Sequence, residues 1–155
     1  GFVYHTADGG RTWARQAGEF GFSEETGEVV GGNYLFDIVA VNPKTAWVVG
    51  IDGYVAKTVD AGKTWRKQMT GVPKTHIFGV SVGEKGVLIA GDGILLRTTA
   101  GGATWREVKV EPSIRYGWLY RIGKRGKEGF VAVGETGWIY GTDTSAGEWR
   151  RAETR

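Results

Sequence analysis

The chain has 155 residues, enough to bury the core of one ordinary domain, and a formal net charge of +3. So small a charge does not by itself indicate nucleic-acid binding, the absence of cysteine excludes disulfides, and no apolar run approaches the roughly 20 residues that span a bilayer. The 27 glycines predict many tight turns, and the 7 Trp, 6 Tyr and 6 Phe favour sheets over helices. The start, GFVYHT, lacks the basic region and long apolar stretch of a signal peptide.

The first predicted elements are a short strand, GFVYHT (1–6), and a turn, TADGGRTW (6–13), and this pair recurs along the chain. The third turn lacks the aspartate, and the fourth is degenerate. The tryptophans that close the turns are 52, 40 and 44 residues apart. The later strands cover 53–58, 93–98 and 137–142, and the later turns cover 58–65, 98–105 and 142–149.

Two further short strands precede each later copy, so each unit reads as four strands, which we call a, b, c and d. No stretch has a sustained helical period with caps. Four short strands every 40 to 50 residues are typical of a β-propeller blade. We therefore expect an all-β propeller of four-stranded antiparallel blades, with a half blade at 1–17 and blades at 33–68, 75–109 and 116–153. The recurrent tryptophan is expected to pack between neighbouring blades.

The turn T-x-D-x-G-x-T-W is the Asp-box, or BNR repeat. The longer stretch TAWVVGIDGYVAKTVDAGKTW (45–65) resembles the photosystem II stability and assembly factor family of propellers. That resemblance covers essentially the whole chain and implies a ring that usually closes with seven blades, in the periplasm, the thylakoid lumen or a secreted location. About three and a half blades are present, so either upstream sequence or a second copy or another chain is expected to complete the ring.

The Asp-box is expected to be structural. Its aspartate can accept hydrogen bonds from backbone N–H groups in the same turn, and its glycine supplies a backbone conformation that other residues resist. A calcium loop needs several oxygen ligands, and a phosphate loop needs a following helix; neither pattern is present. The residues assigned to the structural Asp-boxes are Thr6, Asp8, Gly10, Trp13, Thr58, Asp60, Gly62, Trp65, Gly102, Trp105 and Trp149.

Strand a should line the central channel, with the d–a links and b–c turns on one face and the Asp-boxes on the other. Binding sites usually lie on the former face, where loops vary freely. Leu35, Ile77 and Leu119, and then Ile38, Val80 and Ile122, align as core positions. The residues predicted to bind a partner are Tyr34, Asp37, His76, Arg115, Tyr116, Trp118 and Arg121.

The sequence favours a non-catalytic scaffold that binds a protein, a mechanism in which aromatic and arginine side chains anchor the partner. The resemblance implies a photosystem II subunit as partner if the source is photosynthetic. No cofactor, metal or nucleic acid is expected. The alternative is a carbohydrate-active Asp-box protein, a glycoside hydrolase or a sugar-binding protein, in which Tyr34, Tyr116 and Trp118 stack on sugar rings. The acidic b–c turns, Asp52, Asp92 and Glu135, are the strongest enzymatic feature.

Overall fold

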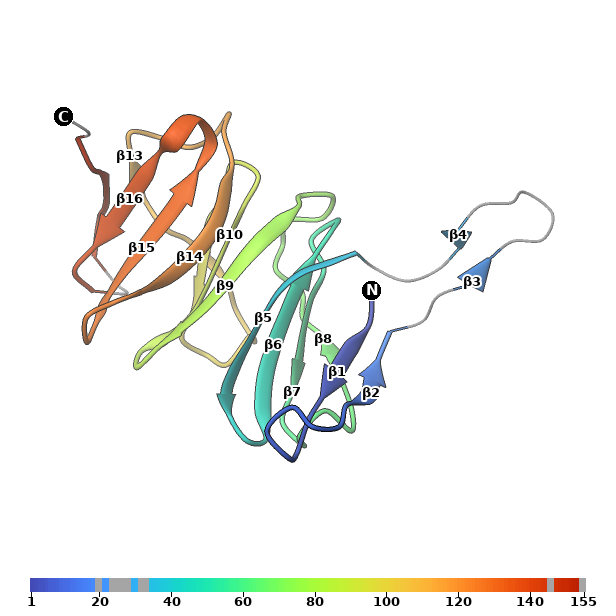
Figure 1. Ribbon diagram of the computed structural model, residues 1–155. Coiled ribbons are helices and arrows are strands. Elements are labelled where there is room, and N and C mark those ends of the chain that lie inside the picture. Colours follow the sequence, from blue (N-terminus) through green and yellow to red (C-terminus); the bar gives the residue numbers. More distant parts are fainter. Residues whose placement is uncertain (19–20, 23–28, 31–33, 145–146, 154–155) are drawn as a thin grey trace.

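The computed structural model describes residues 1–18, 21–22, 29–30, 34–144 and 147–153. These residues form strands and turns, and their single helical segment is a 3-10 turn, Glu135–Gly137. Three sheets contain four antiparallel strands connected in sequence order (Figure 1), which confirms the predicted propeller blades. Their strands are β5 (Leu35–Asn42), β6 (Thr45–Gly50), β7 (Val55–Thr58) and β8 (Arg66–Lys67); β9 (Ile77–Gly83), β10 (Gly86–Gly91), β11 (Leu95–Thr98) and β12 (Arg106–Glu107); and β14 (Leu119–Arg125), β15 (Gly129–Gly134), β16 (Ile139–Thr142) and β17 (Trp149–Arg151).

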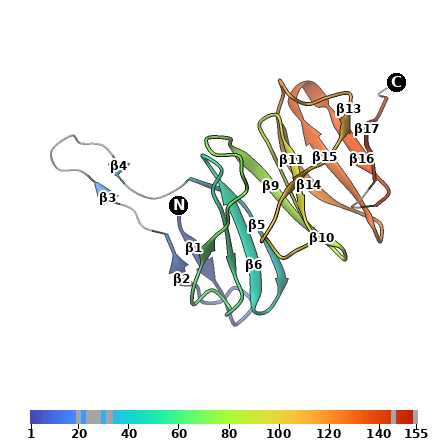
Figure 2. The same cartoon turned by 180° about the vertical axis from the view of Figure 1, so that it is seen from behind.

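Two smaller sheets precede these. Strands β1 (Val3–His5) and β2 (Ala14–Ala17) form an antiparallel pair beside the first four-stranded sheet. Strands β3 (Gly21–Phe22) and β4 (Val29–Val30) form a second pair, which lies apart from the other sheets in both views (Figure 2). The sequence pattern indicated no strands in the stretch that holds β3 and β4.

The last sheet differs from the prediction because it has a fifth strand. Strand β13 (Val110–Glu111) pairs with β17 in parallel, with Val110 opposite Trp149. The link between β12 and β14 therefore runs along the outer edge of the next sheet before it turns inward. Val110 is buried there in the core that the two sheets share, and this burial explains why an apolar residue stands in the link.

The sheets stand side by side, and β5, β9 and β14 are neighbours at their inner edge. Alternate residues of these strands and of β6, β10 and β15 enter the spaces between sheets, as the two-residue period of a strand requires. One core lies between the first two sheets and includes Trp47, and another lies between the last two and includes Trp149. A third joins Val3 of β1 to the first sheet.

The Asp-box tryptophans occupy these spaces unequally. Trp65 and Trp105 pack against the cores on the side of the preceding sheet, and Trp149 is fully buried. Trp13, in contrast, is 60% exposed and does not pack between two of the described sheets. No described sheet lies on the side where the other tryptophans find their partner, and the Trp13 indole N–H instead donates to the Gly10 carbonyl at 3.1 Å.

A second correction concerns Ile38, which the alignment of strand a assigned to the core. Val80 and Ile122, its equivalents, are 4% and 7% exposed, but Ile38 is 51% exposed. The reason is that β1 and β2 form only a two-stranded sheet, which does not cover the inner part of β5. Ile38 instead lines a shallow pocket with Phe2 and Tyr4.

Candidate functional site

The end of the molecule where β5, β9 and β14 begin carries most of the residues predicted to bind a partner. A close backbone contact fixes each blade there: the N–H groups of Ile51, Asp92 and Glu135 donate to the carbonyls of Tyr34, His76 and Trp118 at 2.9, 3.0 and 2.9 Å. The structure thus brings the three aligned positions to the same level. We call this end the mouth, and define it by Tyr34, Asp52, His76, Asp92, Trp118 and Glu135.

Glycines make this arrangement possible. A Cβ atom at Gly50, Gly91 or Gly134 would lie 2.1, 2.0 or 2.2 Å from the carbonyl oxygen of Tyr34, His76 or Trp118. Only a residue without a side chain can stand there, since real Cβ atoms do not approach other atoms so closely. The last residue of each b strand therefore sets the position of a mouth residue.

Tyr34, His76 and Trp118 form one row of rings at the mouth. A second row of aromatic side chains lies next to it, and the sequence pattern did not predict this second row. It consists of Phe36, Phe78 and Tyr120, and each is the extra residue of a β-bulge, where the register with the b strand shifts. A bulge re-aims a side chain, and here it directs the aromatic groups of three neighbouring strands toward one another. Phe36 and Tyr120 are 40% and 42% exposed.

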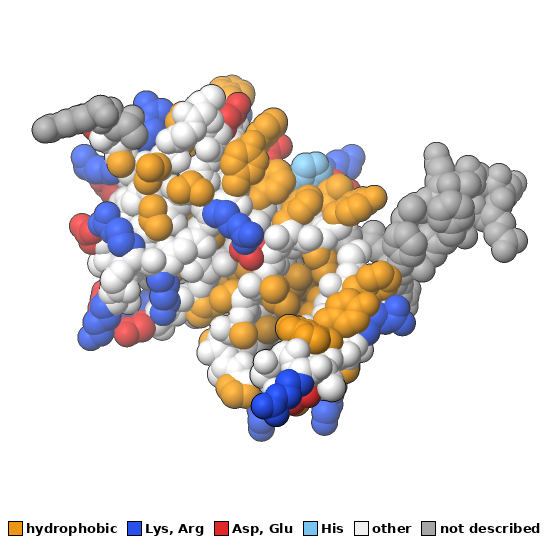
Figure 3. Space-filling model, in the orientation of Figure 1, with side chains coloured by type: hydrophobic (Ala, Val, Ile, Leu, Met, Phe, Trp, Pro, Cys, Tyr) orange, Lys and Arg blue, Asp and Glu red, His pale blue; other side chains and the backbone are white. Residues whose placement is uncertain are grey.

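Ring contacts connect the two rows across all three sheets. Trp118 meets Tyr120 with ring centroids 6.1 Å apart, Tyr120 meets Phe78 at 5.7 Å, and Phe78 meets Phe36 at 5.2 Å. His76 lies against Phe36 at 6.5 Å and against Phe78 at 6.2 Å. Figure 3 shows hydrophobic side chains gathered over the beginnings of β5, β9 and β14. We call Phe36, Phe78, Tyr120, His76 and Trp118 the aromatic wall.

Asp37 and Arg121 each follow a residue of the second aromatic row, Phe36 in β5 and Tyr120 in β14. Their side chains meet across β9 of the middle sheet. The Arg121 guanidinium donates to Asp37 Oδ1 at 2.9 Å, and the Val80 N–H donates to Asp37 Oδ2 at 3.1 Å. The Asp37 side chain is only 15% exposed, whereas that of Arg121 is 65% exposed. Asp37 thus joins three blades, and its carboxylate is occupied by groups of this chain.

The remaining predicted partner-binding residues lie in the link that precedes β14. Tyr116 is 92% exposed, and the Arg115 guanidinium lies 5.9 Å from the centre of its ring. No ion pair involves Arg115 in the part of the chain that the structure describes. Of the two arginines at this end, Arg121 is therefore paired with Asp37, whereas Arg115 makes no ion pair within the described residues.

The Asp-box carboxylates bind groups of their own turns. Asp8 accepts hydrogen bonds from the Thr12 hydroxyl, the Thr12 N–H and the Thr6 hydroxyl at 2.7, 2.9 and 2.7 Å. These bonds lower the pKa of Asp8 far below its ordinary value. Asp60 makes the equivalent bonds to Thr64 and Thr58, and its pKa is lowered to about 2. The third turn has Ala100 at this position, and in the fourth Asp143 is bound by Arg125.

These bonds predict a pH dependence of stability. The carboxylate of Asp60 has a lower pKa in the folded chain than its ordinary 3.8, because Thr64 and Thr58 donate to it. Its contribution is therefore complete above about pH 4 and is lost as the pH falls toward about 2. In urea denaturation at a series of pH values, the wild type should lose stability over this window more steeply than Asp60→Asn. If the stability of the wild type and that of Asp60→Asn fell equally with pH, the lowered pKa of Asp60 would not contribute to stability.

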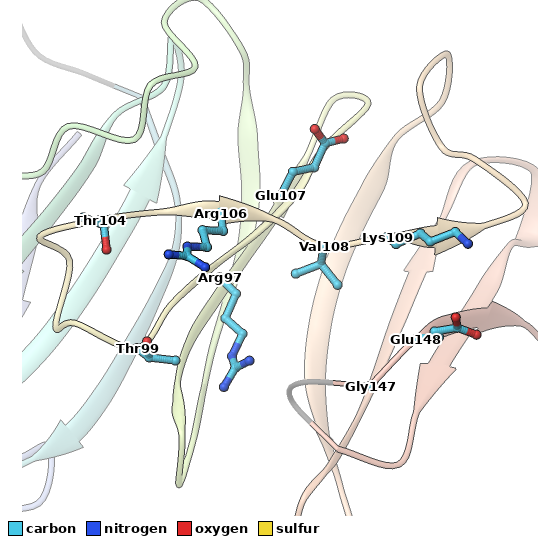
Figure 4. A pocket seen from close by; sticks show the side chains of 9 residues that line it. All are labelled: Arg97, Thr99, Thr104, Arg106, Glu107, Val108, Lys109, Gly147 and Glu148. Carbon is cyan, nitrogen blue, oxygen red and sulfur yellow. The ribbon is translucent and has the colours of Figure 1, made fainter.

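A second concave region lies at the outer edge of the second and third sheets, near the third Asp-box. It is a cavity of about 570 Å³ that Arg97, Arg106 and Lys109 line together with Glu107 and Glu148. Figure 4 shows the ends of these basic side chains pointing in different directions, and Glu107 points away from the rest. The charged groups thus do not converge on one ligand.

Neither a cluster of metal-ligating side chains nor a membrane-spanning helix is found in the segments that the structure describes. No cluster of three or more His, Asp or Glu side chains within them could hold a metal ion. The single helical segment in the described residues, Glu135–Gly137, is too short to cross a bilayer.

Residues 23–154 match the model of a protein family described as photosynthesis system II assembly factor YCF48. The chain belongs to this family. The photosystem II assembly lipoprotein Ycf48 of Synechococcus sp. (strain CC9902) is 24% identical over 122 residues, which are 76% of this chain and 36% of that protein. The chain thus spans a little over a third of the length of this relative.

Solved structures of the family have the same fold. A structure described as YCF48 bound to D1 peptide matches with a TM-score of 0.66 and 24% identity, over 77% of this chain and 39% of that one. YCF48 from Cyanidioschyzon merolae matches with a TM-score of 0.61 and 26% identity, over 77% of this chain and 37% of that one. The partial propeller of this chain thus corresponds to part of a YCF48 propeller.

Proposed function

We propose that this part of the propeller is a non-catalytic scaffold that binds a segment of a photosystem II subunit at its mouth. The observation that carries the proposal is the aromatic wall, which spans three sheets and leaves large rings partly exposed on strands that are fixed by backbone hydrogen bonds. Exposed aromatic and arginine side chains on a rigid frame are typical of protein-binding surfaces. Membership of the YCF48 family supports this function over the carbohydrate-active alternative, and the D1 peptide bound to one relative supports a protein ligand.

The predicted site residues have different roles in this proposal. Trp118, His76, Tyr34 and Tyr116 supply contact area, with Arg115 beside Tyr116 as a cation. Asp37 is a positioning residue, because it holds Arg121 and the three inner strands in place. Phe36, Phe78 and Tyr120 join the site, although sequence alignment did not select them.

The test is binding of labelled peptides from the D1 subunit, measured by fluorescence anisotropy. Trp118→Ala is expected to weaken binding about tenfold or more, because an exposed tryptophan at an interface centre is a common energetic anchor. Trp13→Ala is the matched control, since Trp13 is also exposed but lies at the Asp-box end. Equal affinities of Trp118→Ala and the wild type would place the binding site elsewhere.

A further inference from the structure

The two ring nitrogens of His76, in the aromatic wall, have different surroundings. The backbone N–H of Asp52, in the turn between β6 and β7, donates to His76 Nδ1 at 3.3 Å. The Asp52 carboxylate lies 3.8 Å from the same nitrogen, which is too far for a hydrogen bond. Within the described part of the chain, no hydrogen bond or ion pair involves His76 Nε2.

The hydrogen bond from Asp52 decides which tautomer of the neutral imidazole is present. A ring nitrogen that accepts a hydrogen bond carries a lone pair, and the other nitrogen of a neutral imidazole then carries the proton. Nδ1 is the acceptor in His76, so the N–H group lies at Nε2. Because the donor is a backbone group, we expect the same tautomer whether or not the Asp52 side chain is charged.

The His76 ring is held in place and is still accessible. It packs against Phe36 and Phe78, with interplanar angles of 68° and 71°. The backbone carbonyl of His76 accepts from the Asp92 N–H at 3.0 Å, so neighbouring turns hold both the ring and the main chain. The side chain is 41% exposed. The mouth therefore presents one oriented N–H donor beside apolar rings.

We propose that the Nε2–H group of His76 donates to a backbone carbonyl of an extended protein segment. An apolar side chain of the same segment packs on Phe36 and Phe78. This inference rests on the proposed protein-binding function and names a group of the partner that the site selects. A partner that covered the donor without offering an acceptor would bind less tightly, because the N–H would lose its water and gain nothing.

Two observations favour a backbone carbonyl as the acceptor. In an extended segment the side chains alternate and the carbonyl groups stand between them, so a carbonyl and an apolar side chain can meet neighbouring groups of the wall. The Asp52 carboxylate near His76 Nδ1 repels a second anion at this place, which favours a neutral acceptor over a carboxylate.

Nitrogen-15 NMR of the free protein tests the tautomer. Protonated and unprotonated imidazole nitrogens differ widely in chemical shift, and at about pH 8 histidine side chains are usually neutral. His76 should then carry its proton at Nε2. The chain has two histidines, so the variant His5→Phe identifies the signals of His76. Asp52→Asn keeps the backbone donor and should show the same tautomer. A proton at Nδ1 in the wild type overturns the inference.

A double-mutant cycle tests the contact with the partner. The D1 peptide is synthesised with one thioamide at successive positions, since sulfur accepts hydrogen bonds far more weakly than oxygen. At one position the thioamide should weaken binding to the wild type about tenfold and hardly change binding to His76→Phe, which keeps a ring but has no N–H. His5→Phe is the matched control, because His5 ends β1 beside the first Asp-box, and it should show the full thioamide effect.

The outcomes separate this inference from the proposed function. If Trp118→Ala weakens binding but the wild type and His76→Phe respond equally to every thioamide, only the inference fails. It also fails if replacement of an acidic side chain of the peptide, and of no backbone carbonyl, is coupled to His76. If the D1 peptide does not bind, or binds equally to the wild type, Trp118→Ala and His76→Phe, the proposed function fails as well.

Discussion

Replacing Asp37 with alanine is expected to lower the free energy of unfolding by about 2 to 3 kcal/mol. The substitution leaves the N–H of Val80 without its acceptor, and Val80 is buried. It also removes the ion pair with Arg121, although this contributes less because the Arg121 side chain is largely exposed. Because Asp37 contacts three sheets, the loss affects the packing of blades and not one turn alone. Urea denaturation and thermal unfolding measure the change.

Two further variants separate the contribution of the hydrogen bond to Val80 from that of the Asp37 charge. Asp37→Asn keeps an oxygen acceptor for Val80 but no charge, so it should cost less than Asp37→Ala. Asp92→Ala removes an exposed carboxylate of the mouth and should change stability by less than about 0.5 kcal/mol. If Asp37→Ala were as mild as Asp92→Ala, Asp37 would not connect the blades.

Replacing Gly91 with alanine is expected to destabilise the fold by about 3 kcal/mol, at the upper end of the usual cost of overpacking. The new Cβ would lie 2.0 Å from the His76 carbonyl oxygen and 3.0 Å from the His76 carbonyl carbon. These are backbone atoms of the neighbouring strand, so relief requires that the beginning of β9 move. The melting temperature should fall by about 2 to 4 °C for each kcal/mol in a domain of this size.

Gly123→Ala is the matched control, because Gly123 also lies in a strand but a Cβ there would meet no atom within 4 Å. It should leave stability almost unchanged. A further consequence of Gly91→Ala concerns function: displacement of His76 should weaken peptide binding beyond the loss of stability. A Gly91→Ala variant with wild-type stability would show that the strands can separate there without cost.

The repeats made the fold predictable because each blade contributes the same strand and turn signals. Aligning the units predicted the four-stranded sheets and brought Tyr34, His76 and Trp118 to the same register. The second aromatic row was missed because the alignment treated strand a as regular. Yet Ile77 and Val80 were both assigned to the core, and residues three apart can share a face of a strand only if a bulge lies between them. That mismatch was the available signal for Phe78 and its equivalents.

Other features could not be read from a repeat. The exposure of Ile38 and Trp13 depends on which sheets lie beside them, and this is not a local property of the sequence. The pairing of β13 with β17 joins residues about 40 positions apart, and it is parallel, whereas the other strand pairs of the described residues are antiparallel hairpins. The pairing of Asp37 with Arg121 joins residues 84 positions apart. Tertiary contacts decide these positions.

Strand β13 also bears on how the molecule meets other chains. An unpaired outer strand can add a strand from another protein, and natural sheets suppress this with short, charged edges or with a covering segment. Strands β8 and β12 have two residues each, and all four are charged. Strand β17 is longer and begins with a buried tryptophan, and β13 covers it. The outer edges of these three sheets are thus protected against β-pairing with another chain and against the aggregation that such pairing starts.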